Sequence, residues 1–212
     1  MHGIINNRKI KTLVHFTPIN NLSSILKNGL QSRRLLEKNG LQAVYNDVNR
    51  LDDRKLFNCL SIEFPNFPLF YNFRKNHRNV KYCVIGFDIC LIFNLYCLFC
   101  YTNAANSLIS KKDNKYFKGN AAFLKLFDKE VCGIRRSDYY LPDCFPTDEQ
   151  AEVLVREQIA PQYIKGVRFD DDSLVKFYKK KYPALSIEYC QSYYRDREYF
   201  INRFKDYYDS RN

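Results

Sequence analysis

The spacing of apolar residues near the N-terminus predicts a strand followed by a helix. Residues 12–16 form a short, mostly apolar run of the length that strands favour. Leu22, Ile25 and Leu26 then recur at the i, i+3, i+4 spacing that places side chains on one face of a helix. Gly29 stands directly after this pattern, where helices commonly end.

Four further apolar runs predict strands, and three other stretches predict helices. The strand runs lie at residues 55–64, 80–93, 151–155 and 159–169. The helical stretches are a short segment between residues 30 and 55, residues 120–127, and the basic region 173–212. Because strands and helices are mixed without regular alternation, the sequence predicts an α+β fold rather than a doubly wound sheet.

The composition indicates one globular domain. The chain has 212 residues, of which 46% are hydrophobic, and no Gly-, Ser- or Pro-rich linker interrupts it. We therefore expect residues 1–212 to form a single domain. No apolar stretch reaches the ~18 residues of a membrane-spanning helix, and residues 1–11 lack the apolar segment of a signal peptide. The sequence thus predicts a cytoplasmic protein without a membrane partner.

The net charge and the aromatic residues favour a nucleic acid as partner. A formal charge of +11 attracts polyanions. Tyr and Phe are interleaved with Lys and Arg in stretches such as YYRDREYFINRFKDYY, and such rings can stack on bases while basic groups contact phosphates. The competing interpretation is that most of the rings pack in the core and that the charge serves solubility.

The cysteines do not indicate a metal site. Thiols of a cytoplasmic protein stay reduced, which argues against disulfides. Cys97 and Cys100 have the spacing of half a zinc site, but the sequence contains no second Cys-x-x-Cys or His-x-x-x-His pair. We therefore expect no metal.

Glu152 is a carboxylate placed directly against an apolar run. An unpaired buried carboxylate is costly to desolvate, so Glu152 faces either solvent or a site. Strand alternation places Glu152 and Leu154 on one face, and Ala151, Val153 and Val155 on the other. We interpret Glu152 as a residue at the edge of a strand above a ligand cleft, with the apolar residues anchoring the strand behind it.

A second group of polar residues surrounds the first predicted strand. His15 and Thr17 are two positions apart, so they share one face of the strand, while Phe16 faces the other way. An imidazole and a hydroxyl on one face can bind one ligand, or they can merely satisfy each other or the backbone. The helix that follows begins with Asn21 as a candidate cap, and a helix N-terminus favours anions such as a pyrophosphate.

Six motifs follow one another between residues 14 and 169. They are HFT, NLSSILKNGL, NDVNRLDD, LSIEFPNFPLFYNFR, TNAAN and PTDEQAEVLV. Their order resembles that of the DarT family of DNA ADP-ribosyltransferase toxins. The resemblance implies an ADP-ribosyltransferase fold with a central mixed sheet and surrounding helices. It also implies NAD as a substrate, transfer of ADP-ribose to a base in single-stranded DNA, and a macrodomain antitoxin as partner.

The resemblance also implies roles for individual residues. Glu152 matches the catalytic glutamate, and Arg50 matches the essential arginine, with Arg54 as the alternative match. Asn103, in TNAAN, matches a segment near the DNA path and is a candidate DNA contact. The residues that the resemblance places at NAD, besides Arg50, are His15, Phe16, Thr17, Asn21 and Leu30.

Two further stretches have a functional and a structural interpretation. In FPNFPLFYNFRKNHR, Phe70 or Tyr71 can form a wall for nicotinamide and Arg74 can lead toward DNA, or the stretch is a strand end with a solvated basic turn. The loop at 146–150 precedes Glu152 where a base could be read, which makes Asp148 and Gln150 candidate DNA contacts.

The chemistry of the expected reaction needs a carboxylate. Breaking the nicotinamide–ribose bond develops positive charge on the ribose, which a nearby carboxylate stabilises. The same carboxylate can accept the proton of the attacking base. The motif wording favours guanine over thymine as that base. The alternatives are an ADP-ribosyltransferase that modifies RNA or protein, and a nucleic-acid-binding protein with an inactive pocket.

Overall fold

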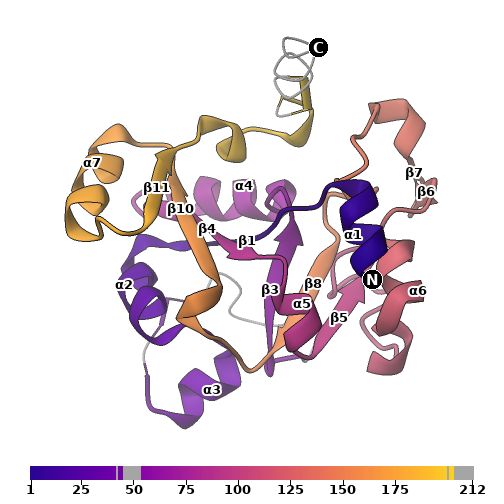
Figure 1. Ribbon diagram of the computed structural model, residues 1–212, viewed down its shortest axis with the longest axis horizontal. Helices are drawn as coiled ribbons and strands as arrows, with labels where there is room; N and C mark the ends of the chain where they lie inside the picture. The colour runs from indigo at the N-terminus through magenta and orange to yellow at the C-terminus, as the bar shows by residue number, and fades with distance from the viewer. Residues whose placement is uncertain (42, 45–53, 200, 203–212) are drawn as a thin grey trace.

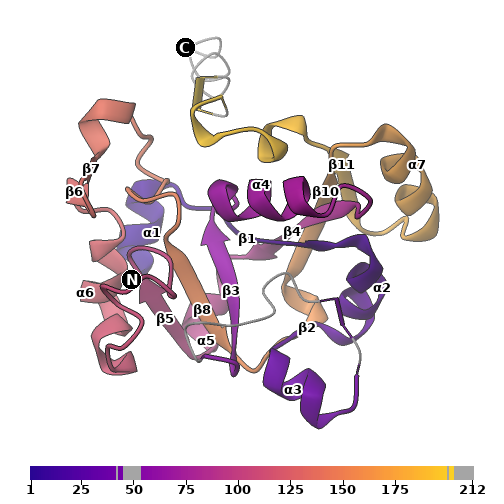
Figure 2. The ribbon, with the colours of Figure 1, turned by 180° about the vertical axis from the view of Figure 1, so that it is seen from behind.

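A seven-stranded mixed sheet forms the centre of the molecule (Figures 1 and 2). The computed structural model describes residues 1–41, 43–44, 54–199 and 201–202. The strand order is β11-β10-β4-β1-β3-β8-β5. β10 and β11 pair in parallel, and the other neighbouring strands of this sheet pair antiparallel. The predicted α+β architecture with a central mixed sheet is therefore confirmed.

The bounds of the elements are as follows. The strands are β1 Thr12–Pro18, β2 Leu30–Gln31, β3 Phe57–Ile62, β4 Tyr82–Asp88, β5 Cys97–Cys100, β6 Glu130–Val131, β7 Ile134–Arg135, β8 Glu152–Arg156, β9 Gln158–Ile159, β10 Ile164–Phe169 and β11 Ser186–Tyr189. The α-helices are α1 His2–Arg8, α2 Ile19–Asn28, α3 Arg33–Lys38, α4 Phe67–Asn76, α5 Leu91–Asn94, α6 Gly119–Lys125 and α7 Asp172–Lys181. The 3-10 helices are η1 Asn114–Phe117, η2 Arg136–Tyr139, η3 Pro161–Tyr163 and η4 Gln191–Tyr194.

The N-terminal strand and helix form as predicted. β1 ends at Pro18, and α2 buries Leu22 and Ile25. α2 ends at Asn28, and the cap residue Gly29 has a φ of 81°, in a region that side chains rarely adopt. A Cβ at Gly29 would also collide with the carbonyl oxygen of Ile159 in β9. Glycine is therefore needed at this position for both backbone conformation and space.

The two faces of the sheet are covered differently. On one face, residues such as Val153 and Val155 pack in a large cluster with α2, α6 and α7. On the other face, Phe16 packs on Phe70 of α4, which crosses β1 and β4 in Figure 2. Leu154 lies in a smaller cluster with residues of β5 and η1. The predicted alternation along β8 is confirmed, because Leu154 faces away from Val153 and Val155.

The sequence predicted one long strand at residues 80–93, and this prediction was wrong. β4 ends at Asp88, and the short helix α5 starts at Leu91. The Asp88 Oδ1 accepts a hydrogen bond of 2.9 Å from the backbone N–H of Cys90, which turns the chain. Continuous hydrophobicity does not distinguish a strand from a buried helical turn, so the run hid this boundary.

Most of the stretch FPNFPLFYNFRKNHR forms the helix α4, Phe67–Asn76, rather than a strand end and a turn, whereas Lys75 and Arg78 are exposed, as the solvated interpretation expected. Asn66 caps α4, and its Oδ1 accepts a hydrogen bond of 3.3 Å from the backbone N–H of Leu69. Pro68 lies in the first turn, where a missing N–H costs nothing. The cap and the proline together start the helix.

The C-terminal region is only partly helical. α7 confirms the helix expected there, but β11 follows it and pairs in parallel with β10. α7 is thus the crossover between two parallel strands, a connection that requires a helix or a similar long segment. In the part of the chain that the structure describes, no helix has the length and apolarity to cross a membrane.

Candidate functional site

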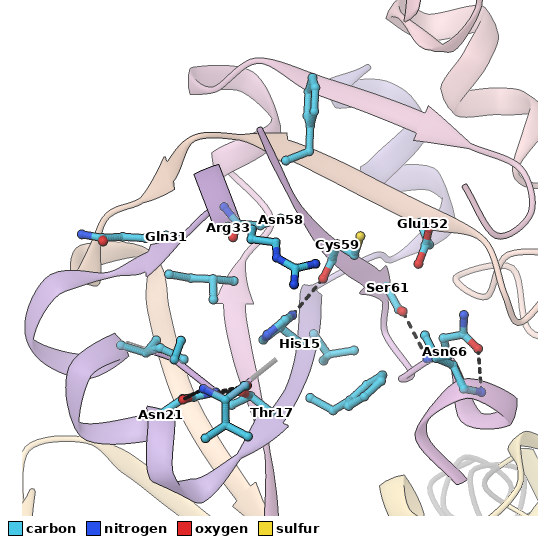
Figure 3. Close-up of a pocket in the computed structure, with 18 of the residues that line it drawn as sticks. His15, Thr17, Asn21, Gln31, Arg33, Asn58, Cys59, Ser61, Asn66 and Glu152 are labelled. Atoms are coloured by element: carbon cyan, nitrogen blue, oxygen red, sulfur yellow. Dashed lines mark hydrogen bonds between the residues drawn. The ribbon is translucent and has the colours of Figure 1, made fainter. Parts of the chain in front are cut away.

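A cavity of about 410 Å³ opens where the central sheet divides. β1 and β3 pair only at Leu13 with Ile62 and at Val14 with Ser61. Beyond these pairs the two strands no longer form a ladder, and the cavity lies at this divergence, bounded also by α2, β2, α3 and the segment 103–105. In Figure 3, Glu152 lies on one side of the cavity, Thr17 and Asn21 on the other, and His15 between them.

His15 is fixed by a bond that spans the divergence. Its Nδ1 lies 2.9 Å from the backbone carbonyl oxygen of Cys59 in β3. A carbonyl oxygen only accepts hydrogen bonds, so Nδ1 carries the proton, and Nε2 of the neutral ring is then an acceptor. His15 thus joins the two halves of the sheet and lines the cavity.

Thr17 and Asn21 form a hydrogen-bonded pair on the α2 side of the cavity. The Asn21 amide donates to Thr17 Oγ1 at 3.0 Å and to the Val44 carbonyl at 2.8 Å, and it accepts from the Val44 N–H at 3.0 Å. The expectation that Asn21 caps α2 is wrong, because β1 continues to Pro18 and Pro18 is the cap residue. Asn21 instead holds Val44 against the cavity.

Glu152 is the first residue of β8 and is buried, with 6% of its surface exposed. Its Oε2 accepts a hydrogen bond of 2.9 Å from the backbone N–H of Ala104. Glu152 lines the cavity rather than an open surface, and its catalytic role stays a prediction. The loop that carries Ala104 positions the carboxylate.

Arg54 supports this loop rather than the cavity. Its guanidinium donates to Asn114 Oδ1 at 3.2 Å and to the carbonyl oxygens of Ala104 at 3.3 Å and Lys112 at 3.1 Å. Arg54 is buried and is not among the described residues that line the cavity. Arg50, the first choice for the essential arginine, lies outside the described residues.

The other residues expected at NAD divide into two groups. Phe16 and Leu30 line the cavity. Phe70 is fully buried, with its ring centroid 4.6 Å from that of Phe16, and it supports the cavity wall from behind. Tyr71 is exposed on α4 and does not line the cavity.

The residues expected at DNA are not gathered in one place. Asn103 lines the cavity beside Ala104, and its role as a DNA contact stays a prediction. Arg74 donates to the Tyr194 carbonyl at 2.9 Å and forms an ion pair of 3.4 Å with Asp170, so it has partners within the chain.

Asp148 and Gln150 form a turn in front of β8. Asp148 is only 2% exposed, and its Oδ1 accepts a hydrogen bond of 2.8 Å from the Gln150 N–H. Gln150 is half-buried, and neither residue lines the cavity. Their roles as DNA contacts stay predictions, and the structure gives Asp148 a local role in closing the turn.

Arg33 is the main cavity residue that the sequence did not reveal. Among the described residues that line the cavity, it is the only Lys or Arg. Its side chain is 13% exposed and forms an ion pair of 3.4 Å with Glu37 one turn along α3. The sequence offers two adjacent arginines, Arg33 and Arg34, and no local signal shows which one faces inward. The polar residues Gln31, Asn58, Ser61 and Asn66 also line the cavity, and no motif in the sequence marks them.

The two cysteines of the half zinc motif do not share a site. Both are buried in β5, but Cys97 packs in the large cluster and Cys100 in the smaller one on the opposite face. Across the described ranges, no group of three or more His, Cys, Asp or Glu side chains is arranged to hold a metal ion.

The cavity combines three chemical features. His15, Thr17 and Asn21 supply hydrogen-bonding groups, Arg33 supplies a positive charge, and Glu152 supplies a negative one. A ligand with hydroxyls and an anionic group fits the first two features. A carbon centre that becomes positive during a reaction is stabilised by the third.

Three solved structures share the fold of this chain. The first is described as Thermosipho africanus DarTG in complex with ADP-ribose, with a TM-score of 0.62 and 18% identity, and the match covers 87% of this chain and 51% of that one. The chain thus spans about half the length of that relative. Thermus sp. 2.9 DarT in complex with NAD+ has a TM-score of 0.60, 15% identity and coverage of 87% and 97%. The same protein in complex with ADP-ribosylated single-stranded DNA has a TM-score of 0.57, 11% identity and coverage of 88% and 97%.

A family model gives the assignment from sequence. No curated protein matches the chain. The family described as ssDNA thymidine ADP-ribosyltransferase, DarT, matches residues 14–201, which is most of the chain and extends beyond the range 14–169 of the recognised motifs. The predicted ADP-ribosyltransferase fold is confirmed by the structural matches. The chain belongs to the DarT family of single-stranded-DNA ADP-ribosyltransferases.

Proposed function

We propose that the chain transfers ADP-ribose from NAD to a nucleobase in single-stranded DNA and releases nicotinamide. The observation that carries this proposal is the position of Glu152. It lines the same cavity as His15, Thr17 and Asn21, although it lies far from them in the sequence. The family assignment supports it, and the Thermus relative binds NAD+ in a similar fold.

Each feature of the cavity has a role in this reaction. Nε2 of His15 and the remaining lone pair of the Asn21 Oδ1 can accept hydrogen bonds from hydroxyl groups of NAD. Arg33 can bind the pyrophosphate, because a guanidinium presents paired donors to phosphate oxygens. Glu152, held by Ala104, can stabilise the charge that develops on the ribose and take the proton of the attacking base. Arg50 remains the proposed essential arginine.

The identity of the modified base is a separate part of the proposal. The sequence motifs favour guanine, whereas the description of the matching family names thymidine. Mass spectrometry of a modified oligonucleotide that contains each base once identifies the target. An adduct on guanine supports the motif-based expectation, and an adduct on thymine overturns it.

The cellular setting is proposed on the same basis. We propose a cytoplasmic toxin that acts as one domain, because the large core cluster includes both Ile5 and Ile201. A macrodomain antitoxin is the proposed partner, and one of the relatives is described as DarTG with bound ADP-ribose.

Labelled NAD tests the proposed reaction directly. The purified protein is incubated with labelled NAD and, separately, with single-stranded DNA, RNA and protein. We expect the label to enter single-stranded DNA, and we expect Glu152→Gln to lose almost all transfer, because the amide is neutral but occupies the same volume. Glu157→Gln is the matched control, since the Glu157 side chain is mostly exposed in the same part of the chain.

The other two functions predict different outcomes in this experiment. If label enters only RNA or only protein, the chain is an ADP-ribosyltransferase with another acceptor. If no acceptor is labelled but the protein binds DNA, the chain is a nucleic-acid-binding protein with an inactive cavity.

A further inference from the structure

The loop that leads into β8 is bound by three arginines from distant parts of the chain. The loop comprises residues 141–147 and precedes the turn before Glu152. We call Arg8, Arg136 and Arg197 the arginine cluster. Arg8 belongs to α1, Arg136 to η2, and Arg197 to the segment after η4.

The arginine cluster binds the backbone of the loop rather than its side chains. Each arginine donates to carbonyl oxygens, and together they bind six of the seven carbonyls in the loop. The bonds are Arg8 to Asp143 at 3.0 Å; Arg136 to Leu141 at 3.5 Å, Pro142 at 2.8 Å and Phe145 at 2.7 Å; and Arg197 to Pro146 at 2.7 Å and Thr147 at 3.0 Å.

Arg197 is the most deeply placed member of the cluster, with 7% of its surface exposed. Burial lowers the pKa of its guanidinium, and the nearby Glu149 and Asp148 carboxylates oppose this effect. A buried cation is tolerated when it is hydrogen-bonded and has nearby counter-charges. Removal of Arg197 would leave the buried carbonyls of Pro146 and Thr147 without these donors.

The backbone held by the cluster is directly connected to Glu152. Thr147 accepts from Arg136 at 3.2 Å, and its hydroxyl donates to the Asp128 carbonyl at 2.6 Å. The turn that follows is closed by the Ala151 N–H, which donates to the Asp148 carbonyl at 3.1 Å. Glu152 comes next in the chain, so a shift of Thr147 is transmitted to the carboxylate through only a short, hydrogen-bonded turn.

The residues that face the proposed NAD site lie on other elements. His15 and Thr17 belong to β1, Asn21 to α2, and Arg33 to α3. The bonds of the arginine cluster go instead to carbonyl oxygens of the loop at residues 141–147. Loss of a cluster arginine should therefore disturb the carboxylate more than the groups that bind NAD.

We propose that Arg197, assisted by Arg136, is a positioning residue for Glu152, and that it makes the C-terminal segment part of the catalytic apparatus. This inference rests on the proposed function, because it requires Glu152 to act in the reaction. Displacement of a catalytic group by about 1 Å can reduce the rate by about 10²-fold.

Steady-state kinetics of Arg197 variants test the inference. The variants are Arg197→Ala and Arg197→Lys, and the assay measures kcat and KM for NAD in transfer to single-stranded DNA. We expect Arg197→Ala to lower kcat by about 10²-fold with KM for NAD unchanged. Arg197→Lys should recover part of the loss, because an ammonium group can donate to the Pro146 or Thr147 carbonyl but lacks the planar fork of arginine.

Stability is controlled with a variant far from the loop. Val175→Ala removes a buried side chain from α7 and is compared through the midpoint of thermal unfolding. Both variants are assayed at temperatures where the same fraction of each is folded. Under these conditions Val175→Ala should keep the kcat of the wild type. If Arg197→Ala does not fold, Arg197→Lys alone must show lower kcat with unchanged KM.

Three outcomes overturn the inference. The first is that Arg197→Lys and Arg197→Ala both have the kcat of the wild type. The second is that Val175→Ala loses as much kcat as Arg197→Ala, and the third is that a higher KM for NAD accounts for the whole fall in kcat/KM. Wild type and Glu152→Gln are run in the same assay. An inactive wild type contradicts the proposed function itself, whereas an active wild type with active Arg197 variants contradicts only the positioning role.

Discussion

At the scale of single residues, the cavity depends on side chains whose environment is set by a few hydrogen bonds. His15 is held by the Cys59 carbonyl, and Glu152 is held by the Ala104 N–H. Both bonds come from backbone groups of neighbouring segments. The two side chains therefore keep their orientation without a ligand, which reduces the reorganisation needed for reaction.

Arg33 provides a prediction at this scale. Arg33→Ala removes the only Lys or Arg among the described residues that line the cavity. We expect KM for NAD to rise at least about tenfold, because a charge-assisted bond to phosphate contributes roughly 1.5–3 kcal/mol. The fall in kcat should be smaller. Initial rates at varied NAD concentration measure both constants.

The adjacent arginine is the control for this prediction. Arg34→Ala removes the same charge from an exposed side chain and should leave KM for NAD unchanged. Equal effects of Arg33→Ala and Arg34→Ala would show that general surface charge, and not a contact in the cavity, determines affinity for NAD.

At the scale of elements, the cavity depends on where helices and strands end. α2 ends just before Gly29, and β2 then pairs with β9, which follows β8 in the chain. This pairing joins the α2 side of the cavity to the segment that carries Glu152. The end of β4 at Asp88, which lies outside the cavity lining, is also set by a side chain, because the chain turns there into α5.

A pair of glycine substitutions tests the requirement at Gly29. Gly29→Ala should lower stability by about 1–3 kcal/mol for its backbone conformation, with a further ~1–3 kcal/mol for the collision with the Ile159 carbonyl. Gly40→Ala is the matched control, because Gly40 also has a positive φ but has open space around it. Chemical denaturation gives both values, and equal losses would rule out the collision.

The turn at Asp88 gives a pH-dependent prediction. The backbone N–H of Cys90 is the main cause that lowers the pKa of Asp88 from 3.8 to about 2, and Lys165, whose Nζ lies 2.9 Å away, adds to it. Because the folded-state pKa is depressed, the ionised carboxylate stabilises the fold above pH 3.8, and this contribution is lost as the pH falls toward 2.

Comparison of wild type with Asp88→Asn checks this prediction. The wild type should be the more stable protein near neutral pH, since the asparagine keeps an acceptor for Cys90 but loses the charge that attracts Lys165. The difference in unfolding free energy should shrink as the pH falls through the window between 3.8 and about 2. A difference that stays constant across this window would contradict the assignment.

At the scale of the whole molecule, the net charge of +11 bears on the binding of DNA. Some of the basic residues are used internally, since Arg54, Arg136 and Arg197 donate to backbone carbonyls. Others, such as Lys165 and Arg74, pair with carboxylates, and the excess of positive charge that remains attracts a polyanion at long range.

Salt provides the corresponding test. We expect KM for a single-stranded oligonucleotide to rise steeply with salt, by about 0.7 in log KM per unit of log salt for each phosphate contacted. KM for NAD should change less, because NAD is bound in a cavity rather than along a charged surface. Measurements at several salt concentrations compare the two slopes, and a DNA slope near zero would contradict an electrostatic contribution.

The sequence by itself determined the local elements and much of the site. The spacing of Leu22 and Ile25 defined α2, and alternation along β8 placed Glu152 opposite Val153 and Val155. Such patterns are readable because the faces of helices and strands repeat at fixed periods. The order of the motifs was sufficient to predict the family, which the family model confirmed.

Only the tertiary structure decided which distant residues meet. It ended β4 at Asp88, added β11 beside β10, placed Arg33 in the cavity, and gave Arg54 and Arg197 internal partners. These features depend on contacts between segments far apart in the chain, for which local periodicity carries no information. An arginine that faces a ligand, a carbonyl or solvent has the same local pattern, and the packing around it selects among the three.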